Sequence, residues 1–110
     1  MTPDAFRKEA LRLAGVEEGG HMGHADFRVN GKIFATLGYP DPAWGMVNLS
    51  PEHQRALVES YPPTFVVAKG AWGARGSTLV KLRAAKVGAV REALEFAWER
   101  RRKKDKPSKG

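Results

Sequence analysis

The fold is decided by the stretch DFRVNGKIFATL, residues 26–37. Asn30-Gly31 is a strong short-range signal for a tight hairpin turn, because both central residues of that turn need a positive φ. Residues 27–29 and 32–37 are therefore expected to be its two antiparallel strands. Strand alternation places Ile33, Ala35 and Leu37 on one face of the second strand.

Three helices are expected around this hairpin. Capping residues predict where the first two begin, at Thr2 before Pro3 and at Ser50 before Pro51. The first would stop near Gly15 and the second before the Pro-Pro pair that follows it. The last would run from about Val87 and end in a basic turn, which suits the negative end of a helix.

Three further strands are expected at residues 45–49, 65–68 and 78–82. The order α-β-β-β-α-β-β-α, with hairpins in place of parallel crossovers, predicts an α+β fold of two layers. We expect an antiparallel sheet of about five strands with the helices on one face and the other face partly open. Residues 1–99 would form one domain, and residues 100–110 a basic helix end and tail.

Positive charge is the strongest compositional feature. The 110 residues include 19 Lys and Arg against 12 Asp and Glu, a net charge of +7. Seven of the basic residues and two of the acidic ones lie in residues 99–110, so most of the net charge sits at the C-terminal end. Such a segment either contacts a polyanion by displacing its counterions or serves only solubility.

Other features exclude whole classes of site. There is no cysteine, which rules out disulfides, cysteine-ligated metals and a cysteine nucleophile. No apolar run approaches the ~20 residues of a membrane helix, and the first residues do not resemble a signal peptide. We therefore expect a cytoplasmic protein that needs no cofactor.

Four segments of the chain carry a resemblance to a known family: His21–Val29, Gly31–Leu37, Leu49–Glu52 and Gly70–Gly73. Taken in this order, they resemble the YjbR/MmcQ family of small bacterial proteins. The resemblance covers roughly residues 5–100. It implies an α+β fold akin to frataxin-like and secretion-chaperone-like folds, and a proposed DNA-binding role through paired hairpin wings. It implies no catalytic residues.

His21 and His24 flank Met22-Gly23 and are weak candidates for metal ligands. A metal would need further ligands converging on the same point. The surrounding glycines argue against a helix, in which residues three apart share a face. The favoured interpretation is that both histidines order a tight connection.

The segment Gly70–Gly76 has a glycine at every third position. A nucleotide cradle is disfavoured, because such a loop normally leads into a helix and this one leads into a strand. We expect a turn hinged by glycines. Either Trp72 folds onto the core as an anchor, or the turn is a wing tip that offers Arg75 to a phosphate; one loop can do both.

Three other aromatic residues have two interpretations each. Trp44 lies in a proline-rich loop, where it either stacks on a partner or covers the edge of the core. Trp98 lies on the apolar stripe of the last helix and is expected in the core. Phe34 is expected to be buried, although alternation points it away from Ile33 and Ala35.

Catalytic signals are weak, since no Ser, His and acid stand at a suggestive spacing. We expect a non-enzymatic DNA-binding protein that contacts phosphates through hairpin wings and a basic C-terminus, with weak sequence selectivity. The alternative is a protein-interaction adaptor that uses its open sheet face or an exposed edge. The expected DNA-contacting residues are Arg28, Lys32, Arg75, Lys81, Arg83, Arg100, Arg101, Arg102, Lys103 and Lys104.

Overall fold

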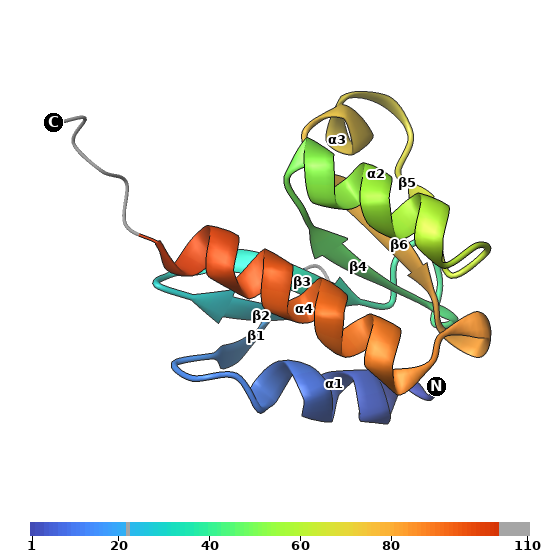
Figure 1. Ribbon diagram of the computed structural model, residues 1–110. Coiled ribbons are helices and arrows are strands. Elements are labelled where there is room, and N and C mark those ends of the chain that lie inside the picture. Colours follow the sequence, from blue (N-terminus) through green and yellow to red (C-terminus); the bar gives the residue numbers. More distant parts are fainter. Residues whose placement is uncertain (22, 104–110) are drawn as a thin grey trace, which may run out of the picture.

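A six-stranded antiparallel sheet in the order β1-β2-β3-β4-β6-β5 organises the molecule. The computed structural model describes residues 1–21 and 23–103 (Figure 1). The α+β class and the antiparallel sheet expected from the sequence are confirmed. The elements are α1 (Pro3–Leu11), β1 (Glu17–His21), β2 (His24–Val29), β3 (Lys32–Leu37), β4 (Trp44–Asn48), α2 (Pro51–Ser60), β5 (Phe65–Val67), α3 (Gly70–Ala74), β6 (Ser77–Lys81), a 3₁₀ turn η1 (Leu82–Ala84) and α4 (Val87–Arg102).

The strand that the sequence did not predict is β1. Its sequence, EEGGH, lacks the β-branched and aromatic residues that favour strands. It forms because its backbone pairs with β2, from Glu17 opposite Arg28 to His21 opposite His24. The sheet therefore gains an edge strand from cross-strand hydrogen bonding and not from local propensity.

The helices cover one face of the sheet. In Figure 1, α4 crosses in front of the strands with α1 beside it, and α2 lies over β6 and β5. Phe6 of α1 is fully buried, and a side chain at Gly45 of β4 would meet its ring. Leu57 of α2 and Leu94 of α4 complete the same core. The sheet thus has a packed inner face, and no helix of residues 1–21 and 23–103 covers its outer face.

A β-bulge changes the alternation expected in β3. Phe27 lies opposite Ala35, but Arg28 lies opposite Ile33, so Phe34 is the extra residue of the bulge. Phe34 and Ala35 are both fully buried in the core, whereas Ile33 is only partly buried and lies outside it. Burial of Phe34 is confirmed. The prediction that Ile33 shares a face with Ala35 was wrong, because the bulge shifts the alternation.

The predicted helix starts are confirmed. The hydroxyl of Thr2 accepts a hydrogen bond from the backbone N–H of Ala5 at 3.0 Å, and that of Ser50 from His53 at 3.1 Å. Helix α1 ends at Leu11, earlier than expected. Helix α4 continues through Arg102, so the basic residues 100–102 form its last turn.

The segment Gly70–Gly76 is not the turn that we expected. Residues 70–74 form the short helix α3, and β5 and β6 pair antiparallel on either side of it. Trp72 does not fold onto the core: it is 69% exposed, the most exposed of the large apolar side chains in the described part of the chain. In that part no helix is both long enough and apolar enough to cross a membrane.

Candidate nucleic-acid interface

Two adjacent arginines of α4 converge on one neutral oxygen. Arg100 Nη1 donates to Asn48 Oδ1 at 2.7 Å and to the backbone oxygen of Leu49 at 2.6 Å. Arg101 Nη2 donates to the same Asn48 Oδ1 at 2.8 Å. These bonds join the last turn of α4 to the end of β4. A single amide oxygen therefore holds two guanidinium groups side by side.

No carboxylate balances these two charges within residues 1–21 and 23–103. The pKa of Arg100 is lowered, first by burial and then by the charge of Arg101. The Nε of Arg101 is buried and has no hydrogen-bond partner in the same part of the chain. Like charges held together at a partly buried position create a positive potential that attracts an anion.

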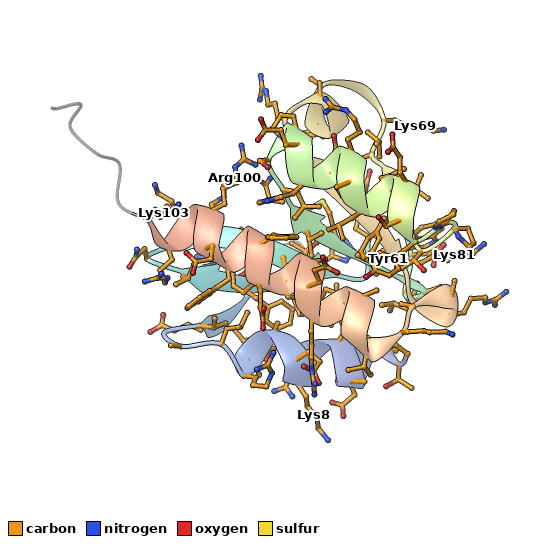
Figure 2. The ribbon with its side chains drawn as sticks, in the orientation of Figure 1. Lys8, Tyr61, Lys69, Lys81, Arg100 and Lys103 are labelled. Carbon is orange, nitrogen blue, oxygen red and sulfur yellow. The ribbon has the colours of Figure 1, made fainter. Side chains whose placement is uncertain are left out.

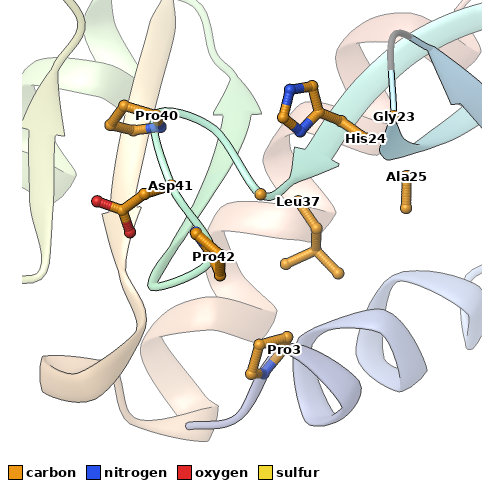
Figure 3. A pocket seen from close by; sticks show the side chains of 9 residues that line it. Pro3, Gly23, His24, Ala25, Leu37, Pro40, Asp41 and Pro42 are labelled. Carbon is orange, nitrogen blue, oxygen red and sulfur yellow. The ribbon is translucent and has the colours of Figure 1, made fainter.

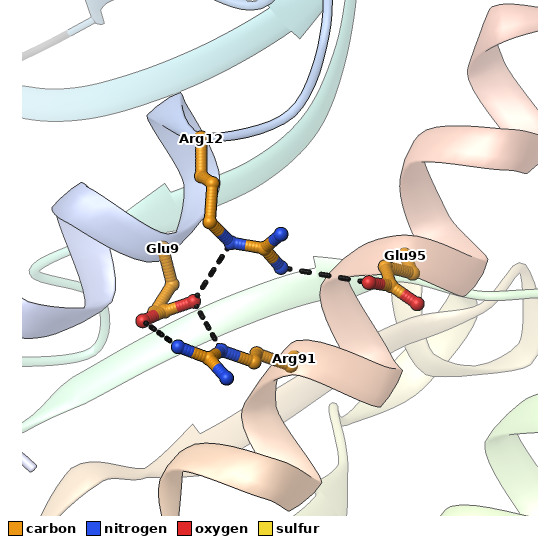
Figure 4. A network of polar contacts seen from close by, with 4 residues as sticks. All are labelled: Glu9, Arg12, Arg91 and Glu95. Atoms are coloured by element: carbon orange, nitrogen blue, oxygen red, sulfur yellow. Dashed lines mark hydrogen bonds and ion pairs between the residues drawn. The ribbon is translucent and has the colours of Figure 1, made fainter.

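Several arginines of α1 and α4 are paired with acids. Glu9 of α1 accepts from Arg91 of α4 at 2.8 Å and from Arg12 at 3.2 Å, and Arg12 reaches Glu95 at 3.5 Å (Figure 4). Arg7 pairs with Glu18 at 2.6 Å in the same way. These pairs cancel charge between α1, β1 and α4. Arg100 and Arg101 differ from these arginines because their shared partner is a neutral oxygen.

Other basic residues lie near this pair. Arg75 directly precedes Gly76, and a side chain added at Gly76 would lie 2.9 Å from Arg100 Nη1. Asn30 Nδ2 of the β2–β3 turn donates to the backbone oxygen of Arg102 at 2.6 Å, so the hairpin that carries Lys32 meets the end of α4. We call Lys32, Arg75, Arg100, Arg101, Arg102 and Lys103 the basic end.

Arg102 of the basic end is paired with an acid at short range. It donates to both oxygens of Glu99 at 3.1 and 3.2 Å. Its guanidinium also lies 4.6 Å from the centre of the Trp98 ring. Trp98 was expected in the core; it is partly buried and packs against the core from its edge, and its Nε1 donates to Ala14 O at 2.9 Å.

Lys81 and Arg83 lie away from the basic end. Lys81 is the last residue of β6, opposite Trp44, whereas Ser77 at the other end of β6 lies opposite Asn48. Four steps along the strand, at about 3.3 Å each, separate these positions by about 13 Å. Figure 2 shows Lys81 at the opposite end of the molecule from Arg100 and Lys103. The expected cations therefore do not all converge on one surface.

Arg28 is engaged in a structural pair. Its Nε and Nη2 donate to the two carboxylate oxygens of Asp26 at 2.8 and 3.1 Å. The side chain of Asp26 is 1% exposed. The pKa of Arg28 is raised, chiefly by its hydrogen bond to Asp26 and then by that residue's charge. This guanidinium serves first to compensate a buried carboxylate.

His24 and the backbone of His21 close the β1–β2 hairpin as opposite residues. This agrees with the interpretation of a tight connection. The side chain of His21 and all of Lys104 lie outside the described residues. Where side chains are described, no group of three or more His, Asp or Glu residues is arranged to hold a metal ion.

His24 also lines the pocket shown in Figure 3, which has a volume of about 450 Å³. Its walls include Pro3 at the start of α1 and Pro40 and Pro42 of the β3–β4 loop. Asp41 is the other ionisable residue of the lining, and Figure 3 shows it on the far side of the pocket from His24. This lining is largely apolar and offers no assembled acid–base pair.

Sequence reasoning missed three residues of this candidate interface. Asn48 joins Arg100 and Arg101, and Lys69 stands at the start of α3. Trp72 was considered only as a core anchor, while the alternative interpretation of this segment, a wing tip, relied on Arg75. The signal available in the sequence is that a basic residue stands three positions before and three positions after Trp72. Nothing in the sequence could have identified Asn48, because its partners lie more than fifty residues away.

Comparison with known proteins gives one match. The family model described as YjbR matches residues 11–100, which is most of the chain and includes the strands, α2, α3 and nearly all of α4. No curated protein and no solved structure matches the chain. The chain therefore belongs to the YjbR family.

Proposed function

We propose that this protein binds nucleic acid, with DNA as the favoured partner, through the basic end. The observation that carries the proposal is the pair Arg100 and Arg101, which share the neutral oxygen of Asn48 without a neighbouring carboxylate in the described chain. Guanidinium groups suit phosphates, since they are planar and offer several donors. Binding would be non-enzymatic and would occur in the cytoplasm.

Low sequence selectivity follows from the same surface. Phosphate contacts position a protein on DNA but do not read its sequence. Among the described elements, α2 and α4 are long enough to enter a major groove, yet the middle of α4 packs on the sheet. The side chains of the basic end can contact the phosphate backbone of DNA, but they do not form a group that reads the edges of the bases.

Fluorescence anisotropy with a labelled DNA duplex, titrated at several salt concentrations, tests the proposal. The logarithm of the association constant should fall with the logarithm of the salt concentration by about 0.9 per phosphate contacted. Arg75→Gln and Lys103→Gln should each remove about one phosphate contact and so reduce the magnitude of that slope by about 0.9. Both residues are exposed, so the variants should fold normally.

The matched control is Lys81→Gln at the opposite end of the molecule. It removes the same charge, so it lowers the net charge equally but should leave the slope nearly unchanged. Equal effects of all three variants would mean that only overall charge matters. No binding of the wild-type protein at low salt would contradict the proposal itself.

A protein-interaction adaptor is the second candidate function. Val66 and Val67 of the edge strand β5 are 41% and 44% exposed, and an exposed edge can accept a strand from another chain. Nuclease-treated pull-downs with the wild-type protein and with Val66→Lys test it. One stoichiometric partner that is lost with the variant would favour the adaptor, and identical results from both proteins would count against it.

A further inference from the structure

We infer that the nucleic acid bound at the basic end is single-stranded and that Trp72 of α3 stacks on one of its bases. This inference rests on the proposed function and names the form of its partner. It is carried by a separate observation: Trp72 of α3 is 69% exposed and stands three residues before Arg75 of the basic end.

The backbone that carries Trp72 is firmly anchored. Gln54 of α2 is buried, and its Nε2 donates to Gly73 O at 3.0 Å and to Thr78 Oγ1 at 3.0 Å. Gly73 is buried so closely against Ala68 that a side chain there would collide with the Ala68 backbone. The face of α3 next to Gly73 is therefore packed, and the indole is displayed on a rigid support. A preorganised ring loses little entropy when it binds.

Cations flank the segment that carries the ring. Lys69 and Arg75 stand three residues before and after Trp72, and they are the residues directly before Gly70 and directly after Ala74 of α3. Both are exposed and have no ion pair in the described chain. The backbone of Arg75 also lies close to Arg100, because Arg75 directly precedes Gly76, where an added Cβ would lie 2.9 Å from Arg100 Nη1. In Figure 2, Arg100 and Lys69 lie on different sides of α3.

An exposed indole ring between two basic residues suits an unstacked base next to a phosphate backbone. In a duplex, the faces of the bases are covered by their neighbours and an indole cannot reach them without unpairing. In a single strand every base has a free face, and proteins that bind single strands combine a basic surface with aromatic platforms. The charge around Trp72 favours this polyanion over an apolar protein partner.

Binding of a labelled oligothymidine, compared with a duplex of equal length, tests the inference. The wild-type protein should bind the single strand more tightly. Trp72→Ala should weaken single-strand binding about tenfold, since stacking contributes roughly that factor per base. Trp72→Phe should restore most of the affinity. Neither variant should change the salt dependence, because the phosphate contacts remain.

Tyr39→Ala is the matched control. Tyr39 is 58% exposed and lies in the loop after β3. The end of β3 lies opposite Gly45 of β4, away from Asn48. This variant should leave binding unchanged. Equal single-strand affinity of wild type and Trp72→Ala, with duplex binding intact, would overturn the single-strand inference alone. If the wild-type protein binds neither the single strand nor the duplex, the proposed function is overturned as well. Self-association that Trp72→Ala abolishes, with DNA binding unaffected, would assign the ring to a protein interface and overturn the inference.

Discussion

Gly76 is required by its backbone angle and by its surroundings. Its φ is +111°, which L side chains rarely adopt, and an added Cβ would collide with the backbone oxygen of Leu49 and lie 2.9 Å from Arg100 Nη1. Its own oxygen accepts from Leu49 N at 2.9 Å. The absence of a side chain at Gly76 thus allows the end of β4, the residues after α3 and the last turn of α4 to pack closely together.

Gly76→Ala should therefore lower the free energy of unfolding by about 2–4 kcal/mol, from backbone strain together with overpacking. Gly88→Ala is the matched control, because Gly88 lies in the first turn of α4 with no atom within 4 Å of an added Cβ. It should stabilise the protein by about 0.5–1 kcal/mol. Urea denaturation measures both, and equal effects would contradict this account.

Glu9 makes folding sensitive to acid. Its hydrogen bond to Arg91 lowers its pKa, helped by Arg12 and opposed by partial burial. A carboxyl whose pKa is lower in the folded protein adds stability above its ordinary value of 4.5, and this stability is lost as pH falls through the lowered value. The arginine partners are about half exposed, so the contribution is limited by solvent screening.

Glu9→Gln should lower the free energy of unfolding by up to about 1 kcal/mol at neutral pH. The difference from wild type should shrink as the pH falls below 4.5. Denaturation curves at several pH values measure this trend, with Glu59→Gln as a control at an exposed position without an ion pair in the described chain. A difference that stays constant with pH would exclude the proposed charge effect.

At the scale of elements, α3 depends on tertiary contacts. A five-residue helix with two glycines is far too short to be stable alone. The side-chain amide of Gln54 holds it to β6 by hydrogen bonds to Gly73 O, to Thr78 Oγ1 and, at 3.3 Å, to Ser77 O. The position of Trp72 thus depends on a residue of another helix.

Gln54→Ala should destabilise the protein by about 1–3 kcal/mol, because buried oxygens lose their donor. It should also speed hydrogen exchange in residues 70–76 more than in β2 and β3. Arg55→Ala, at the exposed neighbouring position, is the control and should change neither quantity. Uniform acceleration across the whole chain would show that Gln54 has no specific role in anchoring α3.

At the scale of the molecule, charge is divided unequally between the two ends. The end at Asn48 brings Arg75, Arg100 and Arg101 together, and Lys81 lies at the other. Arginines of α1 and β2 are largely neutralised by acids. A polyanion should therefore approach the molecule from one end.

NMR titration with oligothymidine should reveal this polarity. Amide shifts should change most at residues 30–32, 48–49, 69–76 and 98–103, because these segments meet at the basic end. Residues 81–86 should change little, although they carry three basic residues. Equal changes at residues 81–86 would mean that binding follows charge alone and does not require the assembled surface.

The sequence by itself determined the elements whose signals are local. The Asn30-Gly31 turn needs positive φ at both residues, and it has φ of 56° and 74°. Caps at Thr2 and Ser50 depend on side chains within three residues of the amides they bind. These predictions succeeded because local geometry and capping act over a few residues.

Only the tertiary structure decided the rest. Strand β1 exists because β2 pairs with it, Phe34 is buried because a bulge shifts the alternation, and Trp72 is exposed because buried Gly73 packs against Ala68. Asn48 gathers Arg100 and Arg101 from residues far along the chain. Pairing register, close packing and convergence of charge depend on contacts between distant segments, and these arise only when the chain folds.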